Sequence, residues 1–170
     1  AGFSFGFQYP YIAKAMNASG QNRGGWEASD VHYFLTQDFF QSLNIKMQQE
    51  STGIAKVTKR QQLGYFEGGT LGVSANQTVF IPSFYEVWGN TTASFNPTET
   101  RDAGCFQYAF FAKGGQTNKN VVAVKPSSIG AGCWWTRSAM AGDGSIFWDV
   151  YSTGDTNTGS AGNKYGVVPC

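Results

Sequence analysis

The chain offers few residues for acid–base or nucleophilic chemistry. It contains a single histidine, His32, so a centre built from several histidines cannot form. It also lacks a G-x-S-x-G nucleophile elbow, a phosphate-binding glycine loop and a dinucleotide fingerprint. The sequence therefore predicts a protein that is not an enzyme and that uses no cofactor.

The acidic and thiol side chains do not have the spacing of a metal site. The chain has three widely separated cysteines, Cys105, Cys133 and Cys170. None of them forms a C-x-x-C pair, which argues against structural zinc, although one disulfide among them stays open. Three aspartates recur every six residues, at Asp143, Asp149 and Asp155. Carboxylates bind calcium, but this spacing does not match a calcium-binding loop. We expect no bound metal.

Composition and charge exclude two further classes of partner. Aromatic residues make up 16% of the 170 residues and charged residues 14%, whereas a charged share of about a quarter is usual. The net charge of +1 lacks the basic stripe of a nucleic-acid-binding protein. No apolar run approaches the roughly 20 residues that span a bilayer, so we expect no direct membrane insertion. The chain starts without Met and shows no signal-peptide pattern, which indicates a processed chain or an excised piece.

Helical signals lie in the first half of the chain. Ser29 is placed to cap a helix whose apolar residues recur at three- and four-residue spacing, namely Val31, Phe34, Leu35 and Phe39. A second helix is predicted over 43–49. Ser83 and Glu86 have the spacing of a capping box, and Gly89 is placed to end the short helix that this box would begin.

Strand signals dominate the second half. Alternating or β-branched segments predict strands at 3–9, 54–58, 78–81, 105–111, 121–124, 133–137, 146–151 and 166–168. Polar, glycine-rich turns separate the later ones. Short helices in the N-terminal half, with small antiparallel sheets and long loops in the C-terminal half, predict an α+β fold. The absence of a linker or repeat favours a single domain over 1–170.

Several short motifs follow one another in a characteristic order. Residues 25–31 contain W-x-x-S, residues 80–89 contain P-S-x-x-E-x-x-G, residues 134–138 read W-W-x-R-S, and residues 166–169 read G-V-x-P. This order resembles a family of bacterial and phage domains with the C-type-lectin-like fold, distantly similar to the formylglycine-generating enzymes. The resemblance covers most of the chain and implies that fold.

Two departures narrow what the resemblance implies. The Glu-Pro-Asn and Trp-Asn-Asp elements of calcium-dependent sugar-binding lectins do not occur here. The formylglycine-generating enzymes need a reactive cysteine pair near the C-terminus, whereas here Cys133 stands alone before the tryptophans and Cys170 is the last residue. Oxidase chemistry is therefore the weakest of the alternatives.

The C-terminal tail carries a more specific resemblance. Residues 134–170 look like the variable region of proteins diversified by retroelements in phages, bacteria or archaea. In that region, adenine-directed mutation restricts the encoded residues, and between 139 and 165 only Met140, Trp148 and Lys164 fall outside the restricted set. The resemblance implies a non-enzymatic recognition domain displayed on a virion or cell surface, with an external protein or glycan as ligand.

The tail divides into framework and candidate contact residues. Trp134 and Trp135 offer large rings for burial, and the guanidinium of Arg137 has five donors for loop carbonyls. The candidate ligand-facing residues are Asp143, Ser145, Ile146, Phe147, Asp149, Tyr151, Ser152, Thr153, Asp155, Thr156 and Asn157. Aromatic rings with small polar neighbours are the composition that antibody loops use for contact. We expect Trp26, Trp88 and Trp148 in the core. A structural virion decoration or fibre-tip module remains the main alternative.

Overall fold

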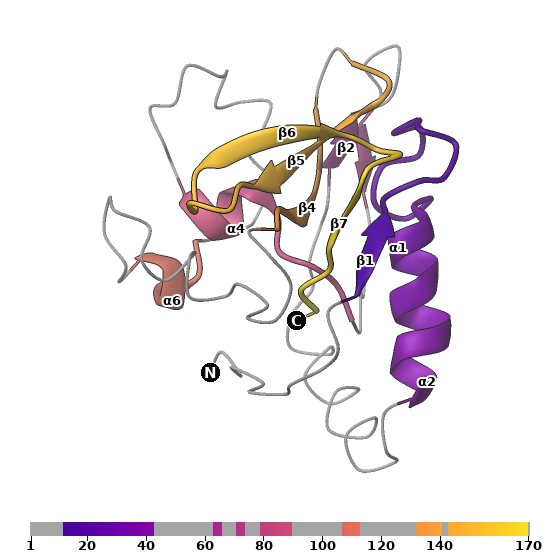
Figure 1. Cartoon of the computed structure of the whole chain (residues 1–170), viewed down its shortest axis with the longest axis horizontal. Helices are drawn as coiled ribbons and strands as arrows, with labels where there is room; N and C mark the ends of the chain where they lie inside the picture. Colours follow the sequence, from indigo (N-terminus) through magenta and orange to yellow (C-terminus); the bar gives the residue numbers. More distant parts are fainter. Residues whose placement is uncertain are drawn as a thin grey trace.

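The computed structural model describes residues 12–42, 63–65, 71–73, 79–89, 107–112, 132–140 and 143–169 (Figure 1). Within these ranges the chain forms an α+β fold with a five-stranded sheet and several short helices. The helix predicted over 43–49 and the strands predicted at 3–9, 54–58 and 121–124 lie outside the described residues.

The main sheet joins the two ends of the described chain. Its strands are β1 Ala13–Ala15, β4 Trp134–Ala139, β5 Ile146–Val150, β6 Thr156–Ser160 and β7 Lys164–Gly166. They lie in the order β1-β7-β4-β5-β6. Strands β4 and β7 run parallel, and the other neighbours are antiparallel. Strand β6 therefore occupies one edge, which Figure 1 shows across the top of the fold. A separate two-stranded sheet pairs β2 Leu63–Tyr65 with β3 Leu71–Val73.

The helices form where the caps were predicted. Helix α1 Asp30–Tyr33 continues through a π-helical stretch, η1 Phe34–Phe39, into α2 Phe40–Ser42, and these make one rod beside β1 (Figure 1). The hydroxyl of Ser29 accepts a hydrogen bond from the amide of His32 at 3.0 Å. Helix α4 Phe84–Trp88 carries the predicted capping box, and Gly89 ends it with φ of 67°. A positive φ at that position favours glycine. Both predicted helix starts are confirmed.

Three strand predictions differ from the structure. Helix α6 Ala109–Ala112 replaces the end of the strand predicted over 105–111, and the amide of Ala112 bonds to the carbonyl of Tyr108 at 2.9 Å. Residues 79–81 are buried but form no strand. The carbonyl of Ile81 accepts from the Arg137 side chain, and that of Pro82 accepts from the Arg137 amide. The final strand covers Lys164–Gly166, so the strand predicted over 166–168 was placed two residues too far along the chain.

The sheet separates two hydrophobic clusters. Adjacent residues in a strand point to opposite faces, so the two neighbouring tryptophans of β4 enter different clusters. Trp135 packs with Phe147 and with the side chains of α1 and η1, whereas Trp134 packs with Trp148 and with α4. Each of these four rings is at most 1% exposed. The expected core positions of Trp26, Trp88 and Trp148 are likewise confirmed by their burial.

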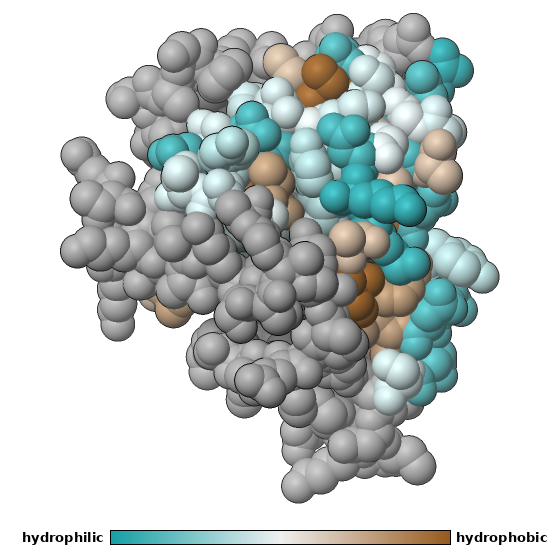
Figure 2. All heavy atoms as spheres, viewed as in Figure 1, coloured by the Kyte–Doolittle hydropathy of each residue, from teal (hydrophilic) through white to brown (hydrophobic). Residues whose placement is uncertain are grey.

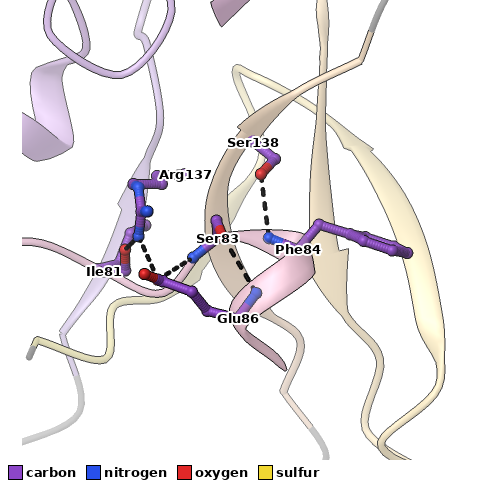
Figure 3. Close-up of polar contacts among 6 residues, drawn as sticks. All are labelled: Ile81, Ser83, Phe84, Glu86, Arg137 and Ser138. Atoms are coloured by element: carbon purple, nitrogen blue, oxygen red, sulfur yellow. Dashed lines mark hydrogen bonds and ion pairs between the residues drawn. The ribbon is translucent and has the colours of Figure 1, made fainter. Parts of the chain in front are cut away.

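A buried ion pair attaches α4 to the central strand (Figure 3). Arg137, 2% exposed, donates from Nη1 to Oε2 of Glu86 at 2.6 Å and to the carbonyl of Ile81 at 2.8 Å. Glu86 is fully buried, and its Oε2 also accepts the amide of Ser83 at 3.0 Å. The same carboxylate thus completes the capping box and pairs with β4. Arg137 holds a loop carbonyl, as expected, but its charge is paired with Glu86, a contact that the sequence did not indicate.

We predict that Arg137→Met strongly destabilises the protein, because it leaves the Glu86 carboxylate buried without its cation. The free energy of unfolding, measured in urea, should fall by about 3–5 kcal/mol. The double variant Arg137→Met/Glu86→Gln should recover part of that loss, since neither side chain then carries a buried charge.

A second cation supplies the control. Lys14, half-buried on β1, places its Nζ 4.2 Å from the ring centroid of Phe34 on η1. Lys14→Met should cost no more than about 1 kcal/mol. Equal losses for Arg137→Met and Lys14→Met would contradict the role given to the ion pair.

Candidate ligand-recognition surface

The candidate contact residues do not form one patch. Strand β5 covers Ile146–Val150, which is about 13 Å at 3.3 Å per residue. The candidates form three groups along the chain: Asp143, Ser145 and Ile146, which lead into β5 and end at its first residue; then Phe147 and Asp149, further inside β5; then, after β5, Tyr151, Ser152, Thr153, Asp155, Thr156 and Asn157. Each group has a different environment.

In the first group, the polar side chains hold the turn that leads into β5. Oδ1 of Asp143 accepts the amide of Ser145 at 2.8 Å and its hydroxyl at 2.7 Å. These hydrogen bonds stabilise the carboxylate and lower the pKa of Asp143. From the other side of the turn, the fully buried Asn22 donates from Nδ2 to the carbonyls of Asp143 at 2.5 Å and Ile146 at 2.9 Å. These polar groups therefore stabilise the β4–β5 connection.

The group inside β5 is buried. Phe147 and Asp149 are both 0% exposed, and the Phe147 ring meets Trp135 edge-on at 6.4 Å between centroids. The expectation that these two residues face a ligand was wrong. The reason is that both faces of this strand are covered by packed side chains, so alternation along β5 does not expose either set.

The carboxylate of Asp149 is buried in the sheet, on the face that carries Phe147 and Trp135. Its two oxygens accept from Nδ2 of Asn157 at 3.1 and 3.3 Å, across the β5–β6 pair. Burial raises the pKa of Asp149 to about 6, against the opposing effect of hydrogen bonds from Asn157 and the thiol of Cys133. Burial and the charge of Asp149 raise the pKa of Cys133 to about 11. That thiol therefore stays protonated at neutral pH and is a weak nucleophile.

The group after β5 reaches solvent. Exposure changes abruptly from Val150, which is 0% exposed, to Tyr151, which is 48% exposed. Thr153 and Asp155 are also exposed, and Ser152 is half-buried. The turn is closed by the amide of Tyr151 bonding to the carbonyl of Asp155 at 2.9 Å, and by Thr153 Oγ1 donating to Asp155 Oδ2 at 2.5 Å. This turn, residues 151–155, is called the recognition turn below.

The base of the recognition turn is attached to helix α4. Gly154 is buried with φ of 90°, a conformation that favours glycine, and its carbonyl accepts the indole N–H of Trp88 at 3.3 Å. The turn therefore has a fixed base and exposed side chains. A ring, a carboxylate and hydroxyls on such a support provide contact area and hydrogen bonds to an external ligand.

The described part of one face of the molecule is mostly polar. In the space-filling view, hydrophilic residues cover much of the described part of the visible face, and hydrophobic residues appear as small separate areas (Figure 2). In the described ranges, no three His, Cys, Asp or Glu side chains gather as metal ligands would. None of the helices found there is long and apolar enough to cross a membrane.

Sequence reasoning missed two parts of this region. Residues 156–160 were taken as turn, although they form β6 and pair with all of β5. The threonines at alternate positions, Thr156 and Thr158, are a β signal that could have indicated this strand. Asn22 was not singled out, and nothing near it in the sequence indicates its bonds to residues more than 120 positions away.

We predict that the protein loses stability as the pH rises through the range in which the Asp149 carboxyl group loses its proton. The folded-state pKa, about 6, lies above the ordinary value of 3.8, so the folded protein binds the proton more tightly than the unfolded chain. The stabilisation that this tighter proton binding contributes is complete below about pH 4 and is lost as the pH rises past about 6. Its upper limit is about 3 kcal/mol, at about 1.4 kcal/mol per pKa unit.

Asp149→Asn should remove this pH dependence and be more stable than the parent at pH 7.5, as measured by urea unfolding across pH 4–8. Asp155→Asn, at an exposed carboxylate, is the matched control and should keep the parent's pH profile. An unchanged profile in Asp149→Asn would show that the buried carboxylate is not its source.

Comparisons with known proteins place the chain in a family. Residues 9–170 match the family described as Domain of unknown function (DUF6273). No curated protein and no solved structure matches the chain significantly. Because the match covers nearly the whole chain, including every strand and helix described above, the protein belongs to the DUF6273 family.

Proposed function

We propose that this protein is a non-enzymatic recognition domain that binds an external protein or glycan through the recognition turn. The observation that carries the proposal is the change from Val150, fully buried, to Tyr151, 48% exposed, at the start of a turn whose base is held by Trp88. A rigid support under exposed polar and aromatic side chains favours binding, because less conformational freedom is lost on contact.

The proposal includes a C-type-lectin-like fold. Its support is that residues of the resembling motifs occupy framework positions. Ser29 caps a helix, the Ser83–Glu86 pair forms a capping box, and the W-W-x-R-S segment forms the central strand with all of its side chains buried. Gly166 of G-V-x-P pairs with both β1 and β4. Motifs retained for folding are the part that a common architecture would share.

The proposal also includes diversification of the tail, with display on a virion or cell surface. The resemblance of residues 134–170 to retroelement-diversified regions motivates it. The fold is compatible with such variation at the recognition turn, because the side chains of Tyr151, Thr153 and Asp155 are exposed while the backbone of the turn makes its own hydrogen bonds. Replacing an exposed side chain on a fixed backbone usually changes stability little.

A second candidate function is a structural virion module, such as a decoration or fibre-tip domain. It is favoured by the edge strand β6, which has five residues, contains no Lys or Pro, and pairs in the described ranges with β5 alone. Proteins commonly protect edge strands with such residues against pairing with another chain. An oxidase related to the formylglycine-generating enzymes receives no support from Cys133, whose raised pKa disfavours the thiolate.

We predict that Tyr151→Ala and Asp155→Asn weaken ligand binding while leaving the unfolding free energy nearly unchanged. Truncating a contact aromatic should lower affinity by about tenfold or more. The full chain would first be screened on a glycan array and a panel of bacterial surface proteins, and affinities then measured by interferometry.

Two residues on the helical rod serve as matched controls. Tyr33 is 66% exposed on α1, and Asp38 is exposed on η1, so Tyr33→Ala and Asp38→Asn should leave binding unchanged. If the recognition-turn variants altered the oligomeric state in analytical ultracentrifugation but not ligand binding, the structural module would be the better account.

Diversification has its own test in the adjoining DNA. We expect a near-identical repeat of the segment encoding residues 134–170, differing mainly at adenines. Sequencing of the flanking region checks this. A flank without such a repeat would remove the diversification proposal and leave the binding proposal intact.

A further inference from the structure

Strand β6 presents Asn157 and Gly159 to the face of the sheet that carries Phe147 and Trp135. Asn157 lies opposite Asp149 and donates to both of its carboxylate oxygens. Gly159 lies opposite Phe147 on the same face. A Cβ on Gly159 would come within 2.5 Å of Tyr165 Cε2 and 3.0 Å of Asp149 Oδ2. Gly159 is buried, and the half-buried Asn157 is bonded to Asp149, so both positions are used within this domain, although the sequence placed Asn157 among the ligand-facing residues.

The alternate residues of β6 have a different environment. Thr156 and Thr158 lie opposite Val150 and Trp148, on the other face of the sheet. This face carries the second cluster, and both threonines are half-buried, as Asn157 is. The difference lies in bonding, because neither threonine hydroxyl bonds to another residue in the described part of the chain. Residues two apart in a strand are separated by about 7 Å. Thr156 and Thr158 thus continue outward from the recognition turn along the edge of the sheet.

We propose that Thr158, together with Thr156, is a specificity-determining residue of the recognition surface, and that Asn157 is a positioning residue that holds the strand onto Asp149. This inference rests on the proposed function. It adds Thr158 to the candidate ligand-facing residues and removes Asn157 from them. A threonine whose hydroxyl has no hydrogen-bond partner among the described residues tolerates replacement. Loss of the Asn157 amide, in contrast, leaves a buried carboxylate without one of its donors.

Two libraries of the full chain, displayed on yeast, test the assignment. Both randomise Tyr151, Thr153, Asp155 and Thr156; the first also randomises Thr158 and the second randomises Asn157 instead. An epitope tag reports the amount of folded protein on the surface, and hen lysozyme and streptavidin serve as binding probes. The libraries differ in one adjacent position, so each is the matched control of the other.

The first library should keep the parent's display level and yield binders in which residue 158 departs from Thr. Reverting that residue to Thr should then lower affinity by about tenfold. In the second library, display should fall, and the clones that remain should return to Asn at 157. Free replacement of Asn157 with full display would overturn its positioning role.

The outcomes separate this inference from the proposed function. Binders whose affinity is unaffected by reverting residue 158 would overturn the role of Thr158 and leave the recognition turn as the binding surface. Well-displayed libraries that yield no binder to either probe would count against the proposed function itself. Loss of display in the first library would show that Thr158 is needed for folding, which also overturns its assignment.

An exchange of partners tests positioning directly. Asn157→Asp alone places a second carboxylate beside Asp149, so display and binding by a selected clone should fall as the pH rises. The exchanged pair Asp149→Asn/Asn157→Asp restores one donor facing one acceptor, and we expect it to recover both readouts. If the exchange recovers neither, the hydrogen bond between positions 149 and 157 does not position the strand.

Discussion

The contact between Arg137 and Glu86 is the interaction on which the other features of the fold depend. Removing two charges from water is costly, and here the cost is offset by a short ion pair and by hydrogen bonds to Ile81 and Ser83. The pair joins the central strand to helix α4. Because Trp88 at the end of that helix holds the carbonyl of Gly154, an interior charge pair helps to place an exposed turn.

The sheet determines which tail residues are available to a partner. With clusters packed on both faces, β4 and β5 lose nearly all solvent contact, and variation within them would disturb one cluster or the other. Within the described tail, exposed residues appear where β5 ends, at Tyr151, Thr153 and Asp155, and again around the β6–β7 turn, at Ser160 and at Gly162 to Lys164. Strand β6, at the edge, is intermediate: Asn157 is committed to Asp149, and its neighbours Thr156 and Thr158 are not. Edge strands thus offer alternate positions for recognition without exposing the core.

The two turns at the ends of β5 show that composition alone does not identify a binding surface. Both contain Asp, Ser or Thr, and Gly. In the first, the carbonyls are held by Asn22 and the Asp143 carboxylate is used locally. In the second, the backbone is satisfied by its own turn and by Trp88, so the side chains of Tyr151 and Asp155 remain exposed. The difference lies in distant partners, not in the residues of the turns.

Local hydrogen bonds explain what the sequence determined by itself. The Ser29 cap and the Ser83–Glu86 box join residues three apart, and aromatic and β-branched residues indicate β4 and β5, so these elements follow from short-range chemistry. The tertiary structure decided which side chains are buried: Phe147 and Asp149 turned inward, and the carbonyl of Ile81 bonded to the side chain of Arg137. The bonds of Arg137 to Ile81 and Glu86 join residues more than 50 positions apart, which no local pattern encodes.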